Sequence, residues 1–414
     1  MSCPFGKGIT RNASHVGLAN EVRPKRGTEP VYYHDYLALD QILTAQKPKS
    51  LEVGGELAHD EMLFITIHQT YELWFKQILH ELESCATFLT AEFIAEKKLL
   101  VIVSRLRRVC EILKVLVSQM KILETMTPQD FLEFRDFLYP ASGFQSVQFR
   151  TLENRLGLPR DKRVRYRHCE YTERLSEEHA RQVEAAEEER KPSMFTLVER
   201  WLCRTPFLQE GWQDGWFSEY RAAVAAMLAE DEAAAELAVT EEDKKAQLES
   251  VTQQRAAFED IFDPEKYEVL RQKGRRRLSY KAMQAALFIQ LYRHEPAFQM
   301  PFQLITCLQD IDELLTQWRY THALVVRRML GSKMGTGGSS GFDYLKATAS
   351  FHKVFDDFFA MSSYIVPASA LPALPDAIKM QLRHGYETAF RKRSLASSMD
   401  ETDKSDEADQ AHSF

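Results

Sequence analysis

Apolar residues recur along this chain at the spacing of α-helices. In the segment 60–89, Phe64, His68, Tyr71 and Phe75 fall four, three and four residues apart, which places them on one helix face. The same period predicts further helices over 99–123, 146–156, 280–292 and 344–361. A chain organised in this way is expected to fold as an all-α protein.

The longest amphipathic segment begins at Pro301 and ends in a glycine-rich loop. Proline suits the first turn of a helix, where its missing N–H costs nothing. Trp318 and His322 lie on the apolar stripe of this helix, so the imidazole is expected to point inward. Five of the seventeen glycines fall between Gly331 and Gly341. The other segments of interest can form the walls of a pocket around this histidine and loop.

The composition supports the helical interpretation and excludes several classes of function. Gly and Pro are scarce, at 17 and 15 of 414 residues, and 44% of the residues are hydrophobic. A net charge of −7 is an ordinary balance for a soluble protein and gives no indication of nucleic-acid binding. The six cysteines form no CxxC pair, so neither a zinc site nor a disulfide framework is expected. No membrane span or secretory signal is apparent, which favours a cytoplasmic protein with reduced thiols.

The chain divides into a core and less regular segments. Residues 1–30 are polar and aperiodic, and they are expected to form a flexible N-terminal arm. Residues 31–157 and 271–390 are predicted to form one helical catalytic core. Between them, the charged, Ala- and Glu-rich stretch 158–270 is predicted to be a peripheral helical hairpin. The acidic tail 391–414 is expected to be disordered.

His322 can be interpreted in two ways. A core histidine satisfied by a hydrogen bond is the commoner outcome of such spacing. The sharper hypothesis is an axial ligand of haem, which needs one imidazole on a rigid helix with apolar neighbours. Trp318, one turn earlier, could cover an edge of such a ring.

The glycine-rich loop matches neither common phosphate-binding motif. The Walker pattern is absent and no strand precedes the loop, so a nucleotide site is not expected. A plain connector does not need five glycines. A lid that closes over a ligand, with Thr336 as a polar contact, fits better.

Two further helix faces each pair an aromatic residue with a polar one. Phe64 and His68 form one pair, and Phe131 and Arg135 form the other. Core packing around a buried ion pair is one explanation. The functional alternative is a pocket for an aromatic substrate whose carboxylate is gripped by the guanidinium fork of Arg135. His68 with Glu72 is an unconvincing metal pair, because no further ligand lies nearby in sequence.

In its motifs, the chain resembles the tryptophan 2,3-dioxygenase family from about Tyr33 to Tyr364. The stretches that carry the resemblance include HDEMLFITIHQTYELWFKQILHEL, FLEFRDFLYPASGFQSVQFRTLENRLG, RRLSYKAMQAALFIQLYR and WRYTHALVVRRMLGSKMGTGGSSGFDYL. Several exceed twenty residues, so chance similarity is not a serious alternative. Only the two termini and the Ala/Glu-rich hairpin fall outside it.

The resemblance implies an all-helical haem dioxygenase with one haem b per subunit. Such enzymes insert both atoms of O₂ across the indole C2–C3 bond of L-tryptophan and yield N-formyl-L-kynurenine, the first step of the kynurenine pathway. It also implies a cytoplasmic homotetramer, a dimer of dimers, in which Tyr33 and Tyr36 reach into a neighbouring site. Two other functions compete with this one. The chain could be a haem- or indole-binding sensor without turnover, or an enzyme that acts on another indole.

On the haem side, the resemblance assigns five positions. His322, in WRYTH, corresponds to the proximal ligand of the iron. Trp318 and Tyr344 correspond to further haem-pocket residues. Ser142 and Gly143, in PASGFQS, would lie over the distal face where O₂ binds, and they are carried over as catalytic residues.

On the substrate side, the resemblance assigns five more. His68, in TIHQTYELWF, corresponds to the catalytic histidine that meets the indole N–H. Arg135 corresponds to the carboxylate clamp, with Phe64 and Phe131 as pocket walls. Thr336, in GTGG, corresponds to the contact with the substrate amino and carboxylate groups.

Overall fold

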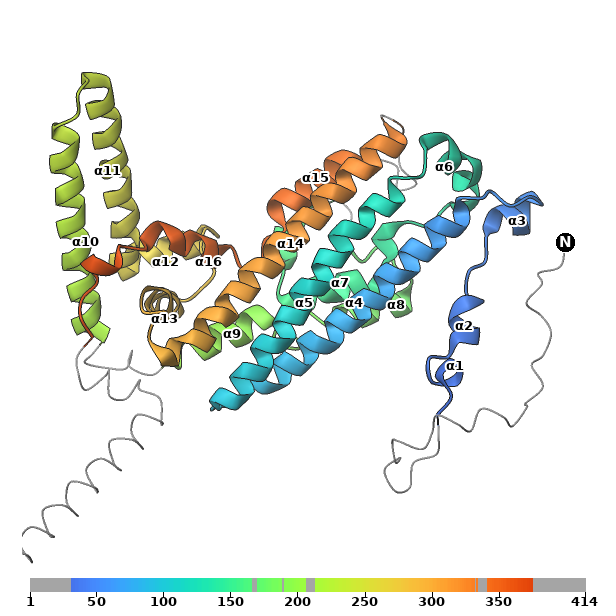
Figure 1. Ribbon diagram of the computed structural model, residues 1–414, viewed down its shortest axis with the longest axis horizontal. Helices are drawn as coiled ribbons and strands as arrows, with labels where there is room; N and C mark the ends of the chain where they lie inside the picture. The colour runs from blue at the N-terminus through green and yellow to red at the C-terminus, as the bar shows by residue number, and fades with distance from the viewer. Residues whose placement is uncertain are drawn as a thin grey trace, which may run out of the picture.

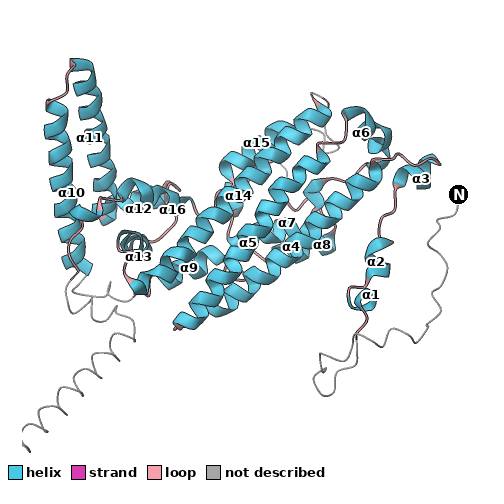
Figure 2. Ribbon diagram, viewed as in Figure 1, coloured by secondary structure: helices cyan, strands magenta, loops and turns pink. Residues whose placement is uncertain are grey.

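A computed structural model describes most of the chain between residues 31 and 374. The described ranges are 31–165, 170–187, 190–205, 213–331, 333 and 341–374. Within them the backbone is helical and forms no strand, which confirms the all-α prediction (Figures 1 and 2). The predicted arm 1–30 and the predicted acidic tail 391–414 lie outside the described residues.

Four helices lie side by side and form the core. They are α4 (Glu61–Leu89), α5 (Glu96–Leu123), α14 (Gln299–Leu330) and α15 (Gly341–Phe351). α4 packs on α5, α5 on α14, and α14 on α15 (Figure 1). The apolar stripes face this interior, where Ile78, Leu106 and Leu308 are fully buried. Burying one such side chain contributes roughly 1.5–3 kcal/mol, so these stripes hold the helices together.

Shorter helices surround the core. They are α1 (Tyr33–Tyr36), α2 (Leu39–Leu43), α3 (Lys49–Gly54), α6 (Pro128–Arg135), α7 (Val147–Leu156), α8 (Glu177–Glu184), α9 (Met194–Leu202), α12 (Pro264–Gln272), α13 (Tyr280–Leu291) and α16 (Asp356–Ala360). α7 and α9 both pack on α4. α10 (Gln213–Glu236) and α11 (Glu241–Phe262) pair with each other and stand away from the core (Figure 1). The domain boundaries at 158 and 270 stay a prediction.

The start of α6 is fixed by a capping box. The Thr127 hydroxyl accepts a hydrogen bond from the Asp130 amide at 3.2 Å, and the Asp130 carboxylate accepts one from the Thr127 amide at 3.0 Å. Pro128 occupies the first turn, where the N–H that proline lacks would have no partner within the helix. The helix start that the sequence predicted is therefore confirmed, and it sets the position of the Phe131 and Arg135 face.

The helix predicted over 344–361 is wrong as one continuous element. α15 ends at Phe351, and α16 begins only at Asp356. The buried carboxylate of Asp312 accepts hydrogen bonds from the Val354 amide at 3.1 Å and the Phe355 amide at 3.0 Å. Because these amides bind a side chain of α14 instead of helix carbonyls, the helix is interrupted there.

One buried ionic cluster joins α7, α14 and the end of α15. The carboxylate of Glu153 accepts hydrogen bonds from Arg150 at 2.9 Å, Arg163 at 2.6 Å and Arg319 at 3.0 Å. His352 lies 3.2 Å from the same carboxylate. Despite complete burial, these arginines hold the pKa of Glu153 well below its usual range. The cluster therefore fixes α14 against α7, which carries Phe149.

We expect His352 to make folding less favourable as the pH falls. Its Nε2 accepts a hydrogen bond from the Val164 amide at 3.0 Å, so Nδ1 carries the proton and the ring is neutral. Burial lowers its pKa below 6.5, although Glu153 acts in the opposite direction. As the pH drops below 6.5, the unfolded chain binds the proton more readily than the folded chain, and the free energy of unfolding falls by at most about 1.4 kcal/mol per pH unit.

The measurement is the free energy of unfolding by urea, at about pH 7.5 and about pH 5.5, for the wild type and His352→Gln. Glutamine keeps one donor and one acceptor but does not titrate. The variant should therefore lose the part of the pH slope that His352 causes. The exposed His80, changed to Gln, is a matched control that should leave the slope intact. Equal slopes in wild type and His352→Gln would contradict the prediction.

Candidate active site

An aromatic corner forms where α4 meets α6. The Phe64 ring centroid lies 4.1 Å from that of His68 and 5.8 Å from that of Phe131. The buried Phe134 packs edge-on against both phenylalanines, at 5.5 and 5.4 Å. The two helix faces singled out in the sequence are therefore brought together. Arg135 ends α6 one turn beyond Phe131 and is half-buried.

His68 is held as a neutral imidazole with a defined tautomer. Its Nδ1 lies 2.7 Å from the Phe64 carbonyl oxygen. Because a carbonyl can only accept, Nδ1 donates and Nε2 is left as the acceptor nitrogen. Desolvation by the surrounding protein lowers the pKa of His68, although the Phe64 carbonyl and Glu72 act in the opposite direction. The ring is nevertheless exposed to solvent, so an incoming ligand can reach it.

His322 lies on α14 within an aromatic environment. Trp318 is 5.6 Å from it between ring centroids, and Trp318 itself packs against Phe149 at 4.9 Å and Phe75 at 6.0 Å. Burial, with a smaller contribution from His68, lowers the pKa of His322 to about 4. The imidazole is therefore neutral near pH 7, as a metal ligand must be.

The hydrogen bonding of His322 separates its two interpretations. Nδ1 is buried and has no hydrogen-bond partner among the described residues. A core histidine would be expected to satisfy that atom, because an unpaired buried polar group costs roughly 1–3 kcal/mol. The arrangement therefore favours a side chain that awaits a ligand.

The loop with Ser142 and Gly143 is fastened to the helix of His68. Glu72, one turn after His68, accepts hydrogen bonds from the Ser146 hydroxyl at 2.6 Å and the Gln148 amide at 2.9 Å. A Cβ atom on Gly143 would meet nothing within 4 Å, so there is open space beside it. No pattern in the sequence indicates this role of Glu72.

The structure also decides against a conventional metal cluster. Glu72 is engaged by the loop after α6 and is not free to join His68 at an ion. Throughout the described part of the chain, no group of three or more His, Cys, Asp or Glu side chains could hold a metal ion. A metal bound through a single imidazole, as in haem, remains compatible with this arrangement.

Tyr344, on α15, lies close to the same loop. Its ring centroid is 4.9 Å from that of Phe144, the residue after Gly143. The side chain of Arg150 is buried nearby. Burial tends to lower the pKa of Arg150, but Glu153 and Tyr344 outweigh that effect and raise it. Since Glu153 also serves two other arginines, this side of the site carries excess positive charge. Sequence reasoning missed Arg150, because nothing in its spacing distinguishes it.

Two predicted residues in the described part of the chain are not brought into this group. Tyr33 and Tyr36, on α1, are 70% and 76% exposed, at the outer surface of the chain. Thr336 lies outside the described residues. The site in one chain therefore comprises the aromatic corner, His322 with Trp318, and the loop at Ser142.

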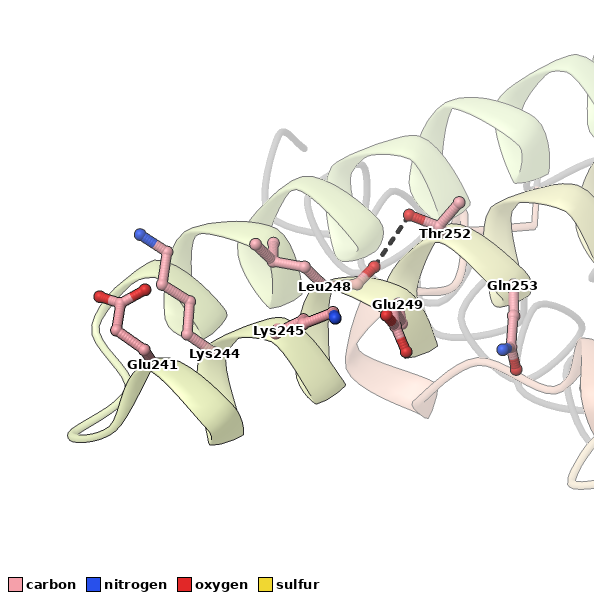
Figure 3. A pocket seen from close by; sticks show the side chains of 7 residues that line it. All are labelled: Glu241, Lys244, Lys245, Leu248, Glu249, Thr252 and Gln253. Carbon is pink, nitrogen blue, oxygen red and sulfur yellow. Dashed lines mark hydrogen bonds between the residues drawn. The ribbon is translucent and has the colours of Figure 1, made fainter.

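A hollow of about 450 Å³ on α11 is unrelated to this chemistry (Figure 3). It is open and lined by Glu241, Lys244, Lys245, Leu248, Glu249, Thr252 and Gln253. Long charged side chains on a solvated helix do not provide the apolar enclosure typical of a ligand site. As for the membrane, every described helix is too short or too polar to cross one.

Comparison with known proteins identifies a single family. A sequence model for the family described as Tryptophan 2,3-dioxygenase matches residues 20–365. A curated relative of that name from Bdellovibrio bacteriovorus is 47% identical over 359 residues, covering 86% of this chain and 99% of the relative. One from Alteromonas mediterranea is 45% identical, covering 86% and 98%, and one from Anopheles gambiae is 42% identical, covering 92% and 96%.

Proposed function

The chain belongs to the tryptophan 2,3-dioxygenase family, and we infer from this premise that it inserts O₂ across the indole C2–C3 bond of L-tryptophan. The product is N-formyl-L-kynurenine, and the reaction opens tryptophan degradation by the kynurenine pathway. The observation that carries this proposal is the family match over 20–365, which includes both His68 and His322.

The test is direct product analysis. Full-length protein supplied with haem and a reductant should convert tryptophan in air to a product heavier by two oxygen atoms. With isotopically labelled O₂, both added atoms should carry the label. Incorporation of one labelled atom, or binding without turnover, would overturn the proposal and favour a monooxygenase or a sensor.

We propose that His322 is the proximal ligand of one haem b per subunit. His322 suits this role because its imidazole is buried and neutral, and its Nδ1 has no partner among the described residues. The ring of Trp318 supplies a flat wall beside it. The long helix α14 holds the imidazole on a rigid element. Tyr344 would line the same pocket. When bound, haem supplies the iron chemistry that activates O₂.

The remaining residues would bind and orient the substrate. Nε2 of His68, free to accept, would take a hydrogen bond from the indole N–H, while Phe64 and Phe131 would pack against the ring. Arg135 would bind the carboxylate through two parallel hydrogen bonds. Thr336 would contact the substrate amino and carboxylate groups.

Ser142 and Gly143 would lie over the face of the haem where O₂ reacts. The open space beside Gly143 supports this, because any larger residue would fill it. Glu72 would hold this loop in position relative to His68 through its hydrogen bond with Ser146. Positioning of this kind is how a protein directs the chemistry of a cofactor.

From the family resemblance, we propose that the chain forms a homotetramer built as a dimer of dimers. Tyr33, Tyr36, Leu43 and Val53 are each more than 65% exposed. These side chains are therefore available for contacts with another subunit. In the proposed assembly, Tyr33 and Tyr36 cover the site of a neighbouring subunit. The cytoplasmic location also stays a proposal from the family resemblance.

Replacing His68 with alanine is expected to weaken the reaction without abolishing it. The imidazole orients the ring by one hydrogen bond, and such a bond is worth about 1 kcal/mol, so kcat/KM should fall roughly tenfold or less. Steady-state kinetics on tryptophan measures this. With 1-methyltryptophan, which has no ring N–H to donate, the two proteins should differ much less. A variant that binds tryptophan in the same pose but shows no turnover at saturation would make His68 an obligatory base.

A further inference from the structure

Two cysteines meet at the contact between α5 and α14. Cys110 and Cys307 are each 4% exposed, and neither is in a disulfide. The sulfur of Cys110 lies 3.6 Å from the carbonyl oxygen of Cys307. The proposed dioxygenase chemistry uses neither residue.

Small molecules can reach this pair through a groove. The groove has a volume of about 320 Å³, and both cysteines line it together with Arg107, Phe302 and Asp310. Arg107 is held at this position by a hydrogen bond from its guanidinium to Gln303, at 3.0 Å. Although each cysteine is only 4% exposed, an oxidant as small as hydrogen peroxide can reach the pair along this groove.

The two thiols are chemically unequal. The neighbouring Cys110 side chain and the positive charge of Arg107 lower the pKa of Cys307, against the effects of burial and Asp310. The Cys307 side chain and burial raise the pKa of Cys110. A thiol of lowered pKa beside one of raised pKa is the arrangement found where a reactive cysteine has a resolving partner.

We propose that Cys110 and Cys307 form a peroxide-sensitive thiol pair that closes to a disulfide between α5 and α14. The Cys307 thiolate takes one oxygen from hydrogen peroxide, which leaves hydroxide and a sulfenic acid. The Cys110 sulfur then attacks the sulfenic sulfur, an S–S bond forms, and water departs with the thiol proton. Two thiols are oxidised and one peroxide is reduced to two waters.

The other described cysteines lack this arrangement. Cys85 donates to the Ile102 carbonyl at 3.8 Å, and burial raises its pKa to about 12. Cys203 contacts the Ser279 hydroxyl at 3.4 Å. The selective chemistry is therefore expected at the α5–α14 contact. A bond there would tie α5 to the helix that carries Trp318 and His322.

Peptide mapping of the native, full-length protein tests the proposal. The protein is treated with hydrogen peroxide, denatured and alkylated, and its peptides are analysed by mass spectrometry. A cross-linked peptide pair containing Cys110 and Cys307, lighter by two hydrogen atoms and lost on reduction with dithiothreitol, is expected. Full alkylation of both cysteines after peroxide treatment that oxidises Cys203 would overturn the proposal.

Variants then assign the roles of the two sulfurs. In Cys110→Ser, a sulfenic acid at Cys307 should persist and be trapped by dimedone. In Cys307→Ser, Cys110 should remain a thiol. Cys85→Ser is the matched control, a buried cysteine whose loss should leave the cross-link intact. Trapping at Cys110 in place of Cys307 would reverse the assignment. Since the mapping of the wild type needs no substitution, poor folding of a variant cannot decide the result.

Discussion

Replacing His322 with alanine is expected to abolish stable haem binding. The buried, neutral imidazole of His322 is suited to bind the iron, and its Nδ1 has no partner among the described residues. Without the axial bond, only apolar packing by residues such as Trp318 would retain the cofactor. The measurement is the Soret absorbance of the purified protein after reconstitution with haem and gel filtration, which should fall to the level of unbound haem.

Two variants make this test specific to ligation. His80→Ala removes an exposed histidine from the core helix α4 and should leave the Soret band unchanged. His322→Gly should lose the band and recover it when free imidazole is added, because the small ligand can occupy the vacated space. Helical circular dichroism would confirm that each variant is folded. A normal Soret band in His322→Ala would reject the assignment of the proximal ligand.

Truncating Arg135 is expected to have the second-largest effect, on substrate binding. One charge-assisted contact is worth roughly 1.5–3 kcal/mol, so Arg135→Ala should lower kcat/KM for tryptophan on the order of ten- to a hundredfold. The loss should appear mainly as a raised KM, since the carboxylate is remote from the reacting bond. Tryptamine, which has no carboxylate, should lose little. Steady-state kinetics on both substrates provides the comparison.

The conservative variant and a neighbouring control sharpen this result. Arg135→Lys keeps the charge but not the planar fork, so it should recover only part of the affinity. Glu133→Gln changes an exposed charge on the same helix and should behave as wild type. Equal losses for tryptophan and tryptamine in Arg135→Ala would show that the clamp is assigned to the wrong residue.

Local patterns were enough to predict most of the helices. The face of Phe64, His68, Tyr71 and Phe75 lies within α4, and the start of α6 is capped as the Thr127 motif indicated. Both signals depend on residues within a few positions of each other. The break after α15 could not be found in this way, because the carboxylate that causes it, on Asp312, lies more than forty residues away.

The candidate site was predictable as a set of residues but not as an arrangement. The resemblance named Phe64, His68 and Phe131, and the structure brings their rings into contact. Their catalytic roles stay predictions. Arg150 and Glu72 were missed because an interior arginine, or a glutamate that fastens a loop, has no distinguishing spacing.

The all-α class, the positions of the long helices and, through the motifs, the family could be predicted from the sequence. These follow from periodicity and from stretches of matching residues, which are properties of neighbours along the chain. The packing of the helices was needed to show that His68 presents Nε2 as an acceptor and that Nδ1 of His322 lacks a partner among the described residues. It also decided that Cys110 meets Cys307. Protonation, tautomer and reactivity depend on burial and on contacts between segments far apart in sequence, and these exist only once the helices have packed.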